Sequence, residues 1–194
     1  MSAQSPTTRS HGPTATMALR ALRVARLDGR IVREVRDDRT ATTQALIIVL
    51  LVAAASALGS AAGAGLGEFL GQLATGVVIS LVFWVVFAAI ALFVGTDLIR
   101  GARSEVTVKE LLRTLGFADA PGLLTALGFI PVLGIVVVLI GFVWVLVAQI
   151  VALRATFETT TGRAIAIAVI TGFASVLVAI IPLAALASLG LADI

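Results

Sequence analysis

The chain has 194 residues, of which 59% are hydrophobic and 13% charged, and its mean hydropathy is +1.11. A soluble domain of this size has too little interior for so many apolar side chains, so an ordinary soluble enzyme is excluded and an integral membrane protein is indicated. The chain has no cysteine and one histidine, His11, which excludes thiolate chemistry, a Ser–His pair in the membrane and haem ligation by histidine. We predict a non-enzyme with no catalytic residues, no cofactor and no metal site.

The first 40 residues divide into a polar tail and a basic helix. Residues 1–16 are rich in Ser, Thr, Ala and Pro and are predicted to be disordered. Residues 17–40 are predicted to form a juxtamembrane amphipathic helix with Val24, Ile31 and Val35 in its apolar sector. Six arginines occupy its opposite side, namely Arg20, Arg23, Arg26, Arg30, Arg33 and Arg36. This pattern favours contact with anionic lipid headgroups, and the alternative is a solvated helix that only obeys the positive-inside rule.

Apolar runs within residues 41–194 predict five membrane spans, at about 45–65, 73–98, 118–131, 134–153 and 164–189. One helix from Pro121 to Leu153 would overshoot a bilayer core of about 30 Å. The segment from Pro131 to Gly134 is therefore predicted to turn the chain, which leaves the third span short. The expected fold class is all-α, a polytopic membrane helical bundle with five transmembrane helices and two cytoplasmic interfacial amphipathic helices.

The positions of the cations support five spans. In this arrangement all fourteen Lys and Arg residues lie on one side, whereas four spans would move Arg154 and Arg163 to the other side. The positive-inside rule then predicts a cytoplasmic N-terminus and an extracytoplasmic C-terminus in an inner or plasma membrane. The pI of 11.0 accompanies a net charge of only +3, so we expect membrane lipids and no nucleic acid as partners.

The polar segment before the third span contains a second helix signal. Thr107 and Glu110 have the spacing of a capping box, and Gly116 is placed to end the helix. We expect this short helix to lie on the cytoplasmic interface with Lys109 and Arg113 facing away, either as a plain connector or as a docking site for a protein. The predicted lipid or partner contacts are Arg20, Arg23, Arg26, Arg30, Arg33, Lys109 and Arg113.

Polar residues near the predicted cytoplasmic boundary form a second candidate site. Its members are Asp97, Arg100, Asp119, Gln149, Arg154 and Glu158. Asp97 is expected to pair with Arg100 or Arg154, and Arg154 with Glu158 at i+4. The cluster either anchors the helices at the interface or opens toward a cytoplasmic partner.

Small and aromatic residues predict close helix packing. Gly59 and Gly63 begin a small-xxx-small ladder, which serves packing within the bundle or, alternatively, a homo-oligomer. Trp84 and Trp144 lie near the middles of their spans, where each indole N–H needs an acceptor. We assign both tryptophans to helix packing.

Several stretches taken together resemble the bacterial branch of the Yip family, small five-span membrane proteins whose eukaryotic relatives were named for binding Ypt/Rab GTPases. The resemblance covers about residues 30–185 and is carried by Arg33–Asp38, Ala41–Leu46, Glu110–Pro121, Ala152–Ala155 and Thr161–Ile165, with Trp144 within the fourth span. It implies a cytosolic N-terminus and five spans, and it supplies no catalytic residues.

The sequence therefore predicts an integral membrane scaffold or adaptor of the Yip type. Its cytoplasmic face would bind lipid headgroups or a protein partner. One alternative is a small-molecule transporter or permeation component, which requires a cavity extending from Asp97 or Gln149 toward the bilayer centre. A second alternative is a membrane-shaping or lipid-handling protein that uses the two interfacial helices as wedges.

Overall fold

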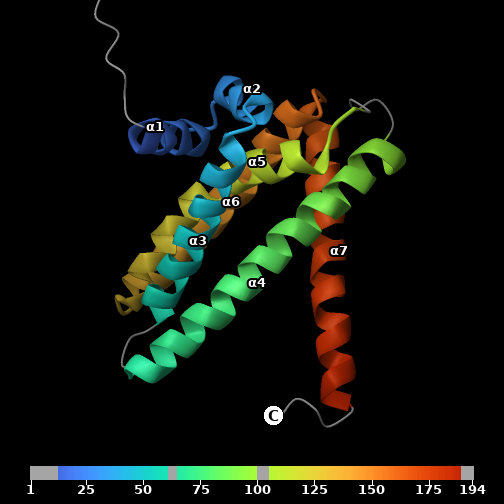
Figure 1. The fold of residues 1–194 in the computed structure, drawn as a ribbon. Coiled ribbons are helices and arrows are strands. Elements are labelled where there is room, and N and C mark those ends of the chain that lie inside the picture. Colours follow the sequence, from blue (N-terminus) through green and yellow to red (C-terminus); the bar gives the residue numbers. More distant parts are fainter. Residues whose placement is uncertain (1–12, 61–64, 100–104, 189–194) are drawn as a thin grey trace, which may run out of the picture.

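The computed structural model describes residues 13–60, 65–99 and 105–188, and the side chains of residues 16–60, 65–99 and 105–178. The regular elements in these ranges are helices (Figure 1). Four of them are long and apolar enough to cross a membrane: α3 (Ala41–Ser60), α4 (Leu66–Phe93) with its π-helical extension η1 (Val94–Leu98), α6 (Leu133–Thr156) and α7 (Thr161–Ser188). The predicted polytopic all-helical class is confirmed to this extent.

The predicted single helix over residues 17–40 is two helices, α1 (Pro13–Ala25) and α2 (Gly29–Asp37). Leu27 adopts the left-handed conformation with φ 65°, and the amide of Asp28 bonds to the carbonyl of Arg23, a pattern that ends α1. Asp28 then caps α2, because its side chain accepts a hydrogen bond from the amide of Arg30. The chain therefore turns between the two helices. Residues 1–12 of the predicted tail lie outside the described residues.

The prediction of a helix lying on the interface at residues 107–116 is wrong in its placement. The capping box is present at the start of α5 (Val108–Ala118), where Thr107 and Glu110 bond reciprocally. However, α5 is buried from Leu111 to Ala118 apart from the half-buried Leu112, because it packs between α3, α4 and α6. It continues through Asp119 into the 3₁₀ helix η2 (Ala120–Phe129). The two helices follow one another directly, and we call them together the α5–η2 rod.

From Gly116 to Gly128, the rod runs in the same direction as α3 and in close contact with it. A Cβ on Gly116 would lie 2.8 Å from the Cβ of Ala45, and one on Gly128 would lie 3.2 Å from the backbone oxygen of Gly59. At Gly59 itself, a Cβ would overlap the backbone oxygen of Thr125. The predicted packing role of Gly59 is thus visible, with the rod as its partner. Gly63 lies outside the described residues.

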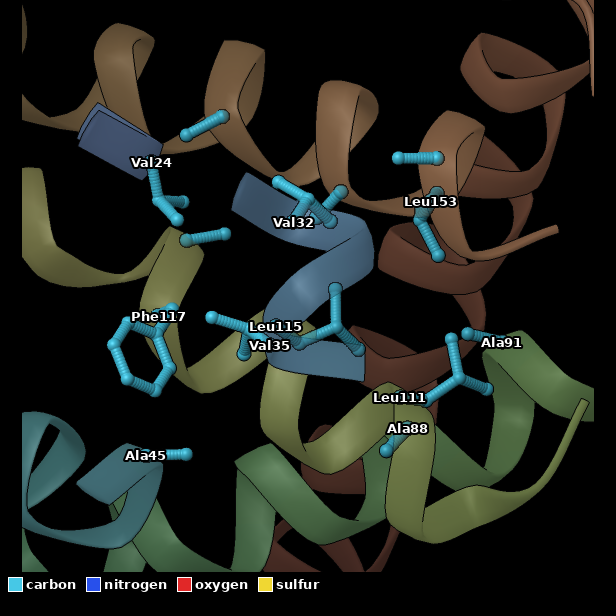
Figure 2. Close-up of a cluster of buried hydrophobic side chains, with 14 of the residues drawn as sticks. Val24, Val32, Val35, Ala45, Ala88, Ala91, Leu111, Leu115, Phe117 and Leu153 are labelled. Carbon is cyan, nitrogen blue, oxygen red and sulfur yellow. The ribbon is translucent and has the colours of Figure 1, made fainter. Parts of the chain in front are cut away.

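The buried core lies at the end of the bundle where α3 begins and α6 ends (Figure 2). α1 and α2 extend over this end in Figure 1. They contribute Val24, Val32 and Val35, which pack with Leu111 and Leu115 of α5. In contrast, α4, α6 and α7 expose many large apolar side chains, as expected for surfaces that face lipid.

The contact at Gly59 generates a stability prediction. Gly59→Ala should lower the free energy of unfolding by about 1–3 kcal/mol, because the methyl group must displace the backbone of the rod. Gly76→Ala in α4 is the matched control, since no atom lies within 4 Å of the added Cβ. Thermal unfolding in detergent, followed by tryptophan fluorescence, compares the two. Equal stability of both variants would contradict the close contact.

Candidate functional site

The candidate site is the polar surface formed by α1, α2 and the first turn of α5, which we call the collar. Arg20 of α1 links three elements of it. Its Nη1 lies 2.7 Å from Asp38 and its Nη2 lies 2.8 Å from Glu34, and Nη1 also donates to Gln44 of α3. Arg20 is only 15% exposed, so this predicted lipid contact is a structural ion pair instead.

Asp38 is the acceptor that joins α2 to this network. The hydroxyl of Thr40 donates to Oδ1 at 2.6 Å, and Arg20 binds the other oxygen. The Thr40 hydrogen bond, followed by that of Arg20, holds the pKa of Asp38 below its ordinary value, although partial burial opposes this. The carboxylate is therefore ionised, and its ion pair is intact, throughout the neutral range.

Arg36 attaches α2 to the end of α6. The residue is buried, and its guanidinium lies 2.8 Å from Asp37 and 2.6 Å from Glu158. It also donates to the carbonyl of Thr156, the last residue of α6. The sequence placed Arg36 only on the basic side of the predicted helix and did not predict this contact, because its partner Glu158 is 122 positions away.

Arg113 does not face away from the protein as predicted. It is 7% exposed, and it donates to Thr42 Oγ1 at 3.1 Å and to the carbonyl oxygen of Arg36. The guanidinium thereby connects α5 to α2 and to the first turn of α3. Of the predicted pair on this helix, Lys109 alone is exposed.

The remaining predicted contacts are on the surface. Exposed side chains in the collar include Arg23, Arg26, Arg30, Arg33 and Lys109. Leu19 and Leu22 of α1, each 48% exposed, lie on the same outward side as Arg23. The outward side of α1 is therefore both cationic and apolar. An open cleft of about 690 Å³ separates Arg30 and Arg33 from Arg154 at the end of α6.

The predicted interfacial polar cluster divides into separate contacts. Gln149 Nε2 donates to Asp119 at 3.0 Å, and Asp97 accepts from Thr96 in η1. Glu158 binds Arg36, while Arg154 is exposed and lines the cleft just described. Arg100 lies outside the described residues. The pairing predicted for Arg154 and Glu158 is thus replaced by a contact between α2 and the turn after α6.

Each tryptophan indole has a backbone acceptor. Trp84 is buried and donates to the carbonyl of Leu112 at 3.1 Å, which ties α4 to α5. Trp144 is 40% exposed and donates to the carbonyl of Ala25 at 2.6 Å. Ala25 ends α1, so Trp144 satisfies a carbonyl that the helix leaves without an internal partner. The indole thereby attaches the end of α1 to α6.

Beneath the collar lies a cavity of about 450 Å³. Its lining comes from α3, α4, α6 and α7 as well as the rod, and is mainly apolar, with Val52, Phe87 and Val145 as examples. Asp119 and Gln149, already bonded to each other, are its main polar members. Within the described ranges, no group of three or more His, Cys, Asp or Glu residues could hold a metal ion.

This arrangement defines a multi-span helical membrane protein with a polar collar at one end of the bundle. The model of the Yip1 domain family matches residues 28–183, and the chain belongs to that family. The match begins at Asp28, the N-cap of α2, so α1 precedes it. The comparisons with curated proteins and with solved structures gave no significant match.

The ion pairs of Arg20 generate a prediction about α1. Arg20→Ala should weaken docking of α1 by about 1–2 kcal/mol, because Glu34 and Asp38 lose a shared cation that is largely shielded from water. Arg23→Ala removes an exposed cation from the same helix and should leave docking unchanged. Amide hydrogen exchange of α1 measures both. Similar exchange in the two variants would show that the Arg20 network does not hold α1.

Proposed function

We propose that this Yip1-domain protein is a non-catalytic membrane scaffold whose collar binds the anionic headgroups of its own membrane. The observation that carries the proposal is that the arginines fall into two groups, one bound to groups of the protein and one exposed. Arg20, Arg36 and Arg113 bind protein groups, whereas Arg23, Arg26, Arg30 and Arg33 remain exposed.

The exposed side chains of α1 favour contact of this helix with lipid rather than with water alone. A helix that only faces water gains nothing from Leu19 and Leu22 on its outward side. Beside Arg23, these leucines give the combination found in helices that lie in a membrane interface, with apolar groups at the acyl boundary and cations at the headgroups. Leu27 adds to this surface, since it lies with Trp144 over the lipid-facing side of α6.

A five-span topology with the collar in the cytoplasm completes the proposal. α5 has 11 residues and η2 has 10, and their lengths laid end to end come to roughly 36 Å, long enough for a bilayer core of about 30 Å. Counted as the third span, the rod puts Arg154 and Arg163 on the same side as the collar. The positive-inside rule makes that side cytoplasmic.

A second candidate function, lipid handling within the membrane, is favoured by the cavity beneath the collar. Its mainly apolar lining fits an acyl chain better than a polar solute, which weighs against the transporter alternative for polar substrates. The neighbouring face of α7 carries two buried hydroxyls, Thr171 and Ser175, with no hydrogen-bond partner among the described residues. We prefer the scaffold function because the collar surface that it requires is present and exposed in the structure.

Nanodiscs of defined composition test the proposal. Amide exchange of α1 should be slower in discs that contain phosphatidylglycerol than in phosphatidylcholine discs. A variant with Arg23, Arg26, Arg30 and Arg33 all changed to Gln should lose this difference. Each arginine near an anionic surface contributes about 1 kcal/mol, roughly a fivefold change in the population of bound α1.

The matched control changes the same four residues to Lys, which keeps the charge and should keep the lipid dependence. If exchange in the wild-type protein is identical in both kinds of disc, the headgroup proposal is wrong and a protein partner becomes the better explanation of the exposed surface.

A further inference from the structure

A second open cleft lies on the collar between the α2–α3 connection and the start of α5. It has a volume of about 990 Å³ and is bordered by Arg36, Arg39, Thr42, Lys109 and Arg113. Arg39 and Lys109 are exposed, whereas Arg36 and Arg113 are buried. Four cations thus surround one concave surface.

Among the described residues, the buried guanidinium of Arg113 has no acidic partner. No Asp or Glu oxygen in the described part of the chain lies within 4.0 Å of it, and its hydrogen bonds go to Thr42 Oγ1 and to the carbonyl of Arg36. A buried charge without a counter-charge is costly, and arginine cannot lose its proton. The unused donors of this planar group therefore favour an anion in the cleft.

The two acids of the cleft do not provide that anion. Asp37 is bound to Arg36 through both of its oxygens. The carboxylate of Glu110 closes the capping box on Thr107, where it accepts from the backbone amide and from the hydroxyl. Both carboxylates are bound to other groups but keep their negative charge, so the described residues of the cleft carry four cations against two acids, a net charge of +2.

We infer that this cleft binds a phosphate group, with Arg113 as the buried donor and Arg39 and Lys109 as the outer cations. Thr42 is the second residue of α3, so Arg113 lies level with the first turn of that candidate span. Headgroup phosphates lie at this depth, which makes a phospholipid with an exposed phosphate the expected source. The site includes none of the four arginines proposed above to bind headgroups. The inference can therefore be tested independently of the proposed scaffold function.

The test uses the full-length protein in a non-ionic detergent, with thermal unfolding at constant ionic strength as the readout. The probes are short-chain phosphatidic acid, short-chain phosphatidylcholine, inorganic phosphate and chloride. Phosphatidic acid should raise the unfolding temperature more than phosphatidylcholine or chloride does. Stabilisation by phosphatidic acid alone identifies a lipid headgroup, and equal stabilisation by inorganic phosphate identifies a free anion of the same chemistry.

The deciding variant is the double substitution Arg39→Ala and Lys109→Ala, because both side chains are exposed and the bonds of Arg113 stay intact. Its affinity for the phosphate probe should fall at least about tenfold, as expected for the loss of charged hydrogen bonds. Arg154→Ala with Arg163→Ala removes two exposed cations outside both the cleft and the headgroup-binding arginines, and should retain the affinity. No stabilisation of the wild type by either phosphate probe, or an equal loss in both double variants, would overturn the inference.

Discussion

The rest of the structure depends on the contact between α3 and the α5–η2 rod, where almost no side chain separates the backbones. Gly59, Gly116 and Gly128 allow this approach, and the rod must therefore follow α3 from its first turn to its last. Once the rod has this direction, the turn after η2 sends α6 back toward the collar. The end of α6 then lies beside α2, which is why Glu158 can bind Arg36. A contact between glycines near one end of the bundle thus determines which charges meet at the other.

In the collar, this packing separates the cations into those bound to groups of the protein and those that are exposed. A guanidinium near a packed core is stable only where carboxylates or carbonyl oxygens accept its hydrogen bonds. The fold provides such acceptors for Arg20 and Arg36. Within the described part of the chain, Arg113 donates to a carbonyl and a hydroxyl oxygen but to no carboxylate. The remaining arginines of α1 and α2 are exposed. The net charge of +3 is therefore a poor guide to function, because the useful quantity is the charge left over after the internal pairs are made.

Features with a local physical cause could be predicted from the sequence. The apolar runs, the capping box at Thr107 and the packing of Gly59 depend on nearby residues or on lipid as solvent. The end of α1 was missed because Leu27, and not glycine, occupies the left-handed position, although Asp28 was a usable N-cap signal for α2. The burial of Arg113 could not be predicted, since its acceptors at Thr42 and Arg36 are 71 and 77 positions away. For the same reason, Glu158 was predicted to pair with Arg154, whereas it binds Arg36.

The central claim is that the rod is a membrane crossing, so that the end of α6 and the collar share one side of the bilayer. The chain has no cysteine, so single-cysteine variants at Arg33, Val132 and Thr160, all exposed, can be labelled without background. An impermeant maleimide applied to inside-out and right-side-out vesicles reports the side of each position. The account predicts that positions 33 and 160 are labelled from the cytoplasmic side and position 132 from the opposite side. Labelling of positions 33 and 160 from opposite sides would contradict it.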